Sequence, residues 1–346
     1  MPPKASETAP EADRFEDAPH PRESVDLVGH AEAERSLLDA YTANRLPHAL
    51  LIGGERGIGK ATLAWRLARF ILANPDPAAA RAARDLHVDP NHPAARQIAA
   101  LSHGNIFLLR REWNEKTRRH FSEIRVDDVR QAMHLFQHAS QGYRICIVDC
   151  ADELNRSAAN ALLKLVEEPP PRSLFLIVAH RPALVLPTLR SRCQTLFLRP
   201  LSNEEVFTVL ERLGEEDVAA CRGAAERAQG SVATALLLLA DGGLELDRLI
   251  SRLLDNLPNI DWRAVHSLAD QVAGRDNEAA FERLMVSIIA WIDARLHSEA
   301  GRGAGRLAPL AEVWEKAAEA ARETEALNLD KRPLVLSIFA DLAGAA

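Results

Sequence analysis

The feature that most constrains the fold of this chain is a glycine-rich loop between an apolar run and a segment with helical periodicity. The loop, GGERGIGK over residues 53–60, contains the pattern Gly-x4-Gly-Lys, follows His48–Ile52 and precedes Ala61–Leu72. Glycines at such a turn let backbone N–H groups surround a phosphate at a helix N-terminus, and the lysine reaches the outer phosphates. The sequence therefore predicts a strand, a phosphate loop and a helix, with these nucleotide-binding residues: Gly54, Gly57, Gly59 and Lys60.

Short apolar runs recur along the first two hundred residues and are typical of buried strands. After His48–Ile52 they are Asn105–Leu109, Arg144–Asp149, Ser173–Ala179 and Gln194–Leu198. Segments with helical periodicity lie between them, notably Val126–His138 and Ser157–Glu168. This alternation predicts an α/β domain with a mostly parallel sheet that helices cover on both faces.

The pattern changes after Pro200, where the strand signal ends and helical periodicity continues to the last residue. Asn203 and Gly214 are the expected cap and stop of the first helix in this part. The polar, proline-rich start of the chain is predicted to be disordered. The predicted organisation is a tail over 1–21, the α/β domain over 22–200, a small helical lid domain over 201–243 and an all-helical domain over 244–346.

Composition narrows the classes of partner and compartment. The formal net charge of −7 argues against strong independent binding to nucleic acid, which needs a concentrated basic surface. No apolar stretch approaches the length that spans a membrane, and the polar start resembles no signal peptide. The four cysteines match neither a disulfide framework nor paired metal knuckles. We therefore expect a cytoplasmic protein with reduced thiols and no membrane contact.

The phosphate loop has two defects as a site of hydrolysis. The residue after the lysine is Ala61, where a serine or threonine normally binds Mg²⁺. Asp149 ends a strand as the carboxylate on the metal side, but Cys150 follows it, and a thiol is a poor general base for water. Asp152 and Glu153 are alternative carboxylates, although both lie past the predicted strand end. The site is predicted to be vestigial, or to bind ATP or ADP weakly without hydrolysis.

Two motifs carry a resemblance to a known family. The first is DCADELNRSAANALLKLVEEPP over residues 149–170, and the second is Ser191-Arg192-Cys193. Together they closely resemble the signature of clamp-loader subunits, a branch of the AAA+ P-loop ATPases, and the likeness extends over Val25–Leu201. The resemblance implies an AAA+ domain, a helical lid and an all-α collar domain that holds a ring together.

The resemblance also implies a role for one arginine. In clamp loaders the arginine of Ser-Arg-Cys reaches the ATP site of the adjacent subunit, where a guanidinium stabilises charge on the transferred phosphate. On this sequence the arginine finger in trans is Arg192. An ATP-hydrolysing tau or gamma subunit would keep four groups that this chain replaces with Ala61, Cys150, His180 and Ala233. The chain therefore resembles a static, non-hydrolysing member of the family.

Partners follow from the same resemblance. It implies a ring with tau or gamma subunits and a delta subunit, acting on the sliding clamp and on primer-template DNA. The candidate for DNA contact is the helix Val126–His138 with Arg125 and Arg130, although a solvated helix face explains the same residues.

Many clamp-loader subunits carry a four-cysteine zinc module after the P-loop helix, and this chain departs from them. The corresponding segment, Asn74–His103, contains no cysteine. His87, His92 and His103 remain, but loop histidines without thiolates are more typical of solvated side chains than of zinc ligands. We therefore predict no zinc, no other metal ligand and no required cofactor.

Two other functions stay open on the sequence alone. In an active motor ATPase of tau or gamma type, Thr62 would recover the lost metal contact. In a small-molecule P-loop kinase or regulatory switch, the motif over 149–170 and Ser191-Arg192-Cys193 would be coincidental.

Overall fold

The computed structural model describes residues 10–15, 18–137, 142–240, 242–274, 277–299, 304–327 and 329–345. The chain divides into two compact units. The first comprises Met1–Glu216 and Gln229–Ala233, and the second comprises Asp217–Ala228 and Thr234–Ala346. The predicted division into 22–200, 201–243 and 244–346 is finer than this and stays a prediction.

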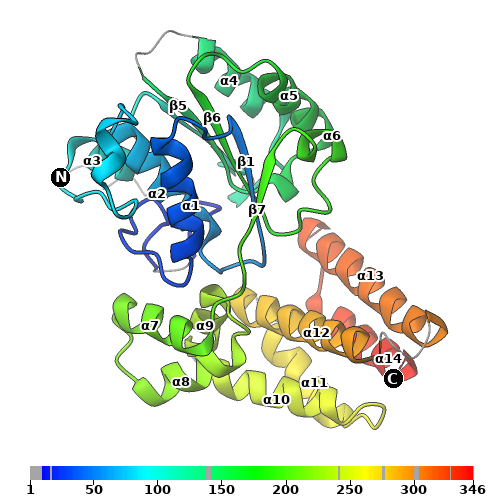
Figure 1. The fold of residues 1–346 in the computed structure, drawn as a ribbon. Coiled ribbons are helices and arrows are strands. Elements are labelled where there is room, and N and C mark those ends of the chain that lie inside the picture. Colours follow the sequence, from blue (N-terminus) through cyan, green and yellow to red (C-terminus); the bar gives the residue numbers. More distant parts are fainter. Residues whose placement is uncertain are drawn as a thin grey trace, which may run out of the picture. The chain divides into compact units, whose positions relative to one another are not determined.

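A five-stranded parallel sheet forms the centre of the first unit (Figure 1). Its strand order is β2-β5-β6-β1-β7. The bounds are β1 Ala49–Gly53, β2 Ile106–Leu109, β5 Arg144–Val148, β6 Ser173–Ala179 and β7 Gln194–Phe197. The predicted α/β class with a mostly parallel sheet is confirmed.

Alternate residues of β1, β2, β5 and β6 enter two separate cores, because successive side chains point to opposite faces of a sheet. Leu50 of β1 and Leu176 of β6 belong to the core that includes Leu63, while Leu51 and Phe175 belong to the core on the other face. Both central strands, β1 and β6, are buried along their whole length. Burial on both faces explains why these strands are continuous apolar runs in the sequence.

Helices cover both faces of this sheet. The helices of the first unit are α1 Ala31–Thr42, α2 Lys60–Ala73, α3 Pro93–Ala99, α4 Val126–Gln137, α5 Arg156–Glu167, α6 Pro187–Arg190 and α7 Asn203–Leu213. Helices α1 and α2 contribute to one core, and α4 and α5 contribute to the other. Short 3-10 turns lie at Ala79–Ala82 and Ala151–Glu153, and β3 Trp113–Asn114 pairs with β4 Arg119–His120 in a separate hairpin.

Local capping fixes where two of the helices begin. The side chain of Asn155 accepts a hydrogen bond from Ala158 N at 2.8 Å and starts α5. Ser202 and Glu205 form a reciprocal capping box at the start of α7, so the cap lies one residue before the predicted Asn203. Helix α7 ends at Gly214 with φ 92°, as predicted.

The start of the chain differs from the prediction of a disordered tail over residues 1–21. Residues 10–15 and 18–21 have a defined place, because their charged side chains find partners far along the sequence. Asp13 pairs with Arg110, and His20, which is fully buried, lies 2.9 Å from Asp13. Arg22 pairs with Glu11 at 2.8 Å. Residues 1–9, 16 and 17 lie outside the described residues.

The second unit is helical in its described part. Its helices are α8 Val218–Arg227, α10 Gly243–Asp255, α11 Trp262–Val272, α12 Glu278–Glu299, α13 Ala304–Leu327 and α14 Lys331–Ala345, while α9 Val232–Leu239 begins in the first unit. Apolar faces of α10 to α14 form one core that includes Leu254, Leu268, Ile288 and Phe339. Among the described residues, no helix is both long and apolar enough to cross a membrane.

Candidate functional site

The phosphate loop follows β1 and leads into α2, as predicted, and three of its glycines have positive φ. The values are 142° at Gly54, 79° at Gly57 and 100° at Gly59, which is the N-cap of α2. A Cβ atom at Gly57 would lie 2.4 Å from the hydroxyl oxygen of Ser231. Glycine is therefore required at position 57 both by the backbone conformation and by a close neighbour.

Lys60 is the first residue of α2 and is turned onto the backbone of its own loop. Its side chain is 2% exposed, and its ammonium group donates a hydrogen bond to the carbonyl oxygen of Glu55. Burial lowers the pKa of Lys60 to about 8, against the attraction of Asp149. The group that would hold the outer phosphates thus already donates to a loop carbonyl.

Two further contacts fasten the loop from outside. The backbone N–H of Val232 donates to the carbonyl oxygen of Gly57 at 2.9 Å. His30 Nε2 lies 2.6 Å from the carbonyl oxygen of Ile58 and donates to it. Val232 precedes Ala233, the position at which an ATP-hydrolysing relative is expected to carry an arginine. Here that segment holds the loop by its backbone.

The carboxyl ends of β5 and β6 bring three predicted positions together. Asp149 and Cys150 follow β5, and His180 follows β6, its neighbour in the sheet. Burial raises the pKa of Asp149 to about 7, with Asp13 and Glu153 adding to the effect. Cys150 is 4% exposed, and burial also raises the pKa of its thiol far above the usual range. Position 150 therefore holds a neutral, buried thiol, where an ATP-hydrolysing subunit is expected to have a carboxylate that activates water.

The two alternative carboxylates are both engaged in other interactions. Asp152 accepts a hydrogen bond from the backbone N–H of His180 at 2.6 Å and another from that of Arg181 at 2.8 Å. Glu153 Oε2 lies 2.9 Å from Arg111 Nε. Both carboxylates thus connect the loop after β5 to neighbouring segments of the chain.

His180 lies where a sensor threonine is expected. Burial, together with the positive charge of Lys60, lowers its pKa to about 4, so the imidazole is neutral at neutral pH. One ligand atom from each of Cys150, Asp152 and His180 lies within 4.8 Å of the others. In the part of the chain that the structure describes, no other set of three or more histidine, cysteine, aspartate and glutamate side chains meets this condition.

Arg192 lies between α6 and β7, in the loop that leads into the edge strand. Its side chain is 42% exposed, and its Nε lies 2.6 Å from Glu167 Oε1 at the end of α5. One terminal nitrogen also donates to the carbonyl oxygen of Thr188 at 3.0 Å. These partners hold Nε and one terminal nitrogen of the guanidinium, while the rest of the group remains accessible. Neither partner belongs to the phosphate loop.

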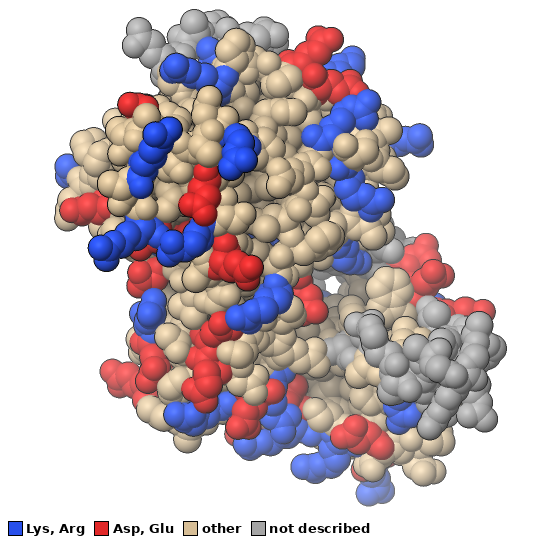
Figure 2. Space-filling view, in the orientation of Figure 1, with Lys and Arg blue, Asp and Glu red and all other residues tan. Residues whose placement is uncertain are grey.

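The candidate DNA-contacting arginines are paired within the chain. Arg125 lies 2.8 Å from Glu112 and 3.2 Å from Asp128, and Arg130 lies 3.0 Å from Asp127. Figure 2 shows basic side chains interspersed with acidic ones over the face drawn. These pairings favour a solvated helix face at α4.

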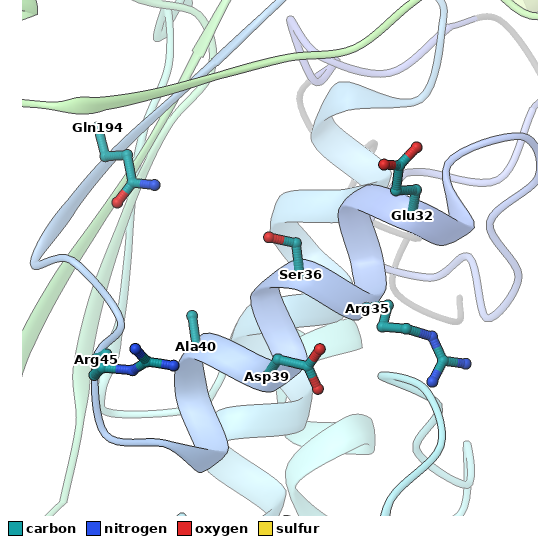
Figure 3. Close-up of a pocket in the computed structure, with 7 residues that line it drawn as sticks. All are labelled: Glu32, Arg35, Ser36, Asp39, Ala40, Arg45 and Gln194. Atoms are coloured by element: carbon teal, nitrogen blue, oxygen red, sulfur yellow. The ribbon is translucent and has the colours of Figure 1, made fainter.

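A surface pocket of about 540 Å³ lies beside the edge strand, away from the phosphate loop (Figure 3). Its lining residues come from α1, from the loop after it and from β7: Glu32, Arg35, Ser36, Asp39, Ala40, Arg45 and Gln194. Ser36 and Gln194 face one another across it. Acidic and basic side chains are both present, so the lining selects no single charge.

The three loop histidines after α2 have separate surroundings. His92 Nδ1 accepts from Ala94 N at 3.2 Å and caps α3, and His103 Nδ1 accepts from Asn105 N at 3.2 Å. His87 is exposed. The side chains of His92 and His103 therefore serve as acceptors for nearby backbone N–H groups.

Sequence reasoning missed the residues that support the site. Glu167, Asp13 and His30 were not singled out. The motif EEPP, which contains Glu167, carried a signal for the first. The other two are recognised only by contacts with residues far along the chain.

Comparison with known proteins identifies the family. The family model described as "DNA polymerase III, delta subunit" matches residues 29–202, half of the chain. The DNA polymerase III subunit delta' of Pseudomonas aeruginosa is 37% identical over 148 residues, which are 42% of this chain and 41% of that protein. The subunit delta' of Escherichia coli K12 is 31% identical over 230 residues, or 65% of each chain.

Similarity extends to a second type of subunit. The DNA polymerase III subunit gamma/tau of Mycobacterium tuberculosis is 30% identical over 205 residues, which are 57% of this chain and 32% of that protein. The chain thus spans less than two thirds of the length of each of these relatives. A solved gamma subunit-related protein of Thermotoga maritima is 15% identical, with a TM-score of 0.41, over 91% of this chain and 99% of that one. On the family model and the delta' relatives, the chain belongs to the delta prime family of DNA polymerase III clamp-loader subunits.

Proposed function

We propose that this chain is a non-hydrolysing clamp-loader subunit that presents Arg192 to the ATP site of a neighbouring subunit. The observation that carries the proposal is the contrast between two groups. Lys60, which should bind a phosphate in its own site, is buried and bonded to a loop carbonyl. Arg192 is accessible and held at its stem by Glu167.

The chain's own site supports the first half of this proposal. Hydrolysis needs a base that orients water beside the outer phosphate. Cys150 is a buried thiol with a strongly raised pKa. Asp152 and Glu153 belong to the 3-10 turn after β5, so neither takes the place in the chain that the base holds in an ATP-hydrolysing relative. With Ala61 in place of a magnesium ligand, both the metal contact and the base are missing.

The surroundings of Arg192 support the second half. A guanidinium carries five N–H donors in a planar fork, and the contacts to Glu167 and Thr188 leave donors for a phosphate. An arginine supplied in trans stabilises the charge that develops on the transferred phosphoryl group. The exposed fraction of 42% is compatible with insertion into a neighbour.

The partners are part of the same proposal. They are tau or gamma subunits and a delta subunit, together with the sliding clamp and primer-template DNA within the complex. The helical region 244–346 would form the collar. In this arrangement the chain needs no cofactor of its own, and any ATP or ADP bound at Lys60 stays intact.

The test is reconstitution of the clamp loader with Arg192→Ala. We expect the DNA- and clamp-stimulated ATPase of the complex to fall, because loss of a transition-state arginine costs on the order of 10³ at the affected site. Other sites in the complex limit the total fall. Arg190→Ala, two residues away, is the matched control. Assembly, followed by gel filtration, should survive both changes, and an unchanged ATPase in Arg192→Ala would overturn the finger role.

The similarity to gamma/tau subunits supports a second candidate function, ATP hydrolysis as a subunit of that type. Steady-state ATPase of the purified chain separates the two functions. The non-hydrolysing role predicts no turnover above a Lys60→Ala control. Turnover that disappears in Lys60→Ala would establish the motor function and reject the static one.

A further inference from the structure

We propose that Cys150, Asp152 and His180 form a binding site for a thiophilic divalent metal ion of the zinc type. The site lies at the carboxyl ends of β5 and β6 and is separate from the proposed role of Arg192. Neither inference depends on the other.

The arrangement of ligand atoms is the main observation. A thiol sulfur, a carboxylate oxygen and an imidazole nitrogen lie within 4.8 Å of one another. Around a tetrahedral zinc ion, with bonds of about 2.0 to 2.3 Å, such atoms lie about 3.3 to 3.6 Å apart. Side-chain movements of about 1 Å would therefore bring the three groups to one ion, and water would complete the tetrahedron.

The fold holds the three groups near one another before any ion arrives. β5 and β6 are adjacent parallel strands, with Val148 in register with Ile177, so the residues that follow them emerge at one edge of the sheet. Hydrogen bonds from the backbone N–H groups of His180 and Arg181 fix the Asp152 carboxylate. Each carboxylate oxygen has a further lone pair, so these bonds leave Asp152 able to bind a cation.

His180 supplies a second, independent observation. Its Nδ1 is inaccessible to solvent and has no hydrogen-bond partner among the described residues. Buried polar atoms are normally paired, and an unpaired one calls for a physical explanation. A metal ion bound to Nδ1 would give this atom the partner that it lacks.

The charges of the site fit a divalent ion. A thiolate and a carboxylate offset both positive charges, and the imidazole binds as a neutral ligand. Binding removes the proton of the Cys150 thiol and releases it to solvent, so each ion bound releases one proton. Sulfur and nitrogen ligands favour zinc-type ions over magnesium or calcium, which prefer oxygen.

This site departs from the expectation that the chain binds no zinc. That expectation concerned the segment Asn74–His103, whereas the cluster joins residues that follow two different strands, β5 and β6. Cys150 and His180 occupy two of the positions where an ATP-hydrolysing relative would keep a glutamate and a threonine. The two side chains that replace groups needed for hydrolysis thus become two ligands of one metal site.

Cobalt(II) is the probe for the test, because its spectrum reports thiolate ligands. The full chain, stripped of metal by a chelator, is titrated with Co²⁺ and then with Zn²⁺. We expect a thiolate-to-cobalt charge-transfer band that saturates at one ion per chain and disappears when Zn²⁺ displaces the cobalt. Absence of the band in the unaltered chain would overturn the proposal.

Matched variants locate the site. Cys150→Ala should abolish the band, and His180→Ala should weaken Co²⁺ binding by at least about 10-fold. Cys193→Ala and Cys221→Ala are controls that should retain it. A band that persists in Cys150→Ala would mean that another cysteine supplies the thiolate, which contradicts the assignment of Cys150 as a ligand.

A second measurement covers the case in which a variant fails to fold. X-ray absorption at the zinc edge of the unaltered, loaded chain should show one sulfur at about 2.3 Å and nitrogen or oxygen ligands at about 2.0 Å. A shell of oxygen and nitrogen alone, or one with several sulfurs, contradicts a site built from Cys150, Asp152 and His180.

Discussion

Arg192 Nε lies 2.6 Å from Glu167 Oε1, and this ion pair joins the two motifs by which the family is recognised. Glu167 ends α5, and Arg192 stands just before β7. The carboxylate therefore orients the guanidinium without covering it, since the Arg192 side chain is 42% exposed.

Glu167→Gln should separate positioning from folding. Both side chains are more than a third exposed, so the pair contributes less than about 1 kcal/mol to stability, and the urea midpoint should barely move. The ATPase of the reconstituted complex should nevertheless fall, though less than in Arg192→Ala, because the guanidinium loses its orientation. Glu168→Gln, one residue further on, is the control. Equal ATPase in both glutamine variants contradicts a positioning role for Glu167.

Gly57→Ala should destabilise the first unit. Its φ of 79° is strained for alanine, and the new Cβ would lie 2.4 Å from Ser231 Oγ and 2.6 Å from Ala233 Cβ. We expect a loss of more than about 1 kcal/mol in the free energy of unfolding. Gly104→Ala, where a Cβ meets nothing within 4 Å, provides the comparison. Similar urea midpoints for the two variants would show that the loop adjusts at no cost.

Cys150→Glu should fail to restore an ATPase and should also destabilise the chain. Burial raises the pKa of the group at position 150, and the carboxyl groups of Glu153, Asp152 and Asp149 add to the effect, so a carboxylate there is buried beside groups of its own charge. The expected loss at neutral pH is about 3 kcal/mol, measured by urea unfolding in the presence of a chelator. Cys150→Gln, of the same size but uncharged, isolates the effect of the charge. A Cys150→Glu variant as stable as Cys150→Gln would mean that water screens this position.

Asp13→Asn tests whether the start of the chain contributes to stability. The Asp13 side chain is 4% exposed and pairs with both Arg110 and His20. Removing its charge should cost about 2 to 3 kcal/mol, because the buried carboxylate no longer offsets the charge of Arg110. Arg14→Gln removes an exposed pair with Glu23 from the same segment and should cost less than about 0.5 kcal/mol. Equal unfolding free energies in the two variants would show that the segment is not held by Asp13.

Glu205 gives a dependence on pH. Hydrogen bonding to Arg199, with a smaller contribution from Ser202, lowers the pKa of Glu205 from 4.5 to about 2. A depressed pKa in the folded state stabilises the fold above pH 4.5, and this stabilisation is lost as the pH falls toward 2. Because the pair is partly exposed, Glu205→Gln should cost about 1 kcal/mol at pH 7 and almost nothing near pH 2. The same deficit at both pH values contradicts this account, and Glu211→Gln serves as the control on α7.

The interior strands β1, β5 and β6 could be predicted because they are buried on both faces. The run Ser173–Ala179 coincides with β6. The run His48–Ile52 begins and ends one residue earlier than β1, which is Ala49–Gly53. Apolar runs of this kind are local in the sequence. The two-residue strands β3 and β4 are too short to produce such a pattern.

Features that depend on distant partners could not be predicted. The first residues of the chain are polar and proline-rich, which indicates disorder, but Asp13 pairs with an arginine 97 residues away. Likewise, the role of Asp152 depends on backbone N–H groups 28 and 29 residues later. Phosphate-loop residues were recognised from spacing alone, whereas the bond between Lys60 and Glu55 is visible only in three dimensions.

That bond has a consequence for nucleotide binding. The ammonium of Lys60 already has a partner inside the protein, the carbonyl oxygen of Glu55. An incoming triphosphate gains only the difference between its own contacts and those it must break. Any triphosphate bound at Lys60 would therefore be held less tightly than its own contacts alone would provide.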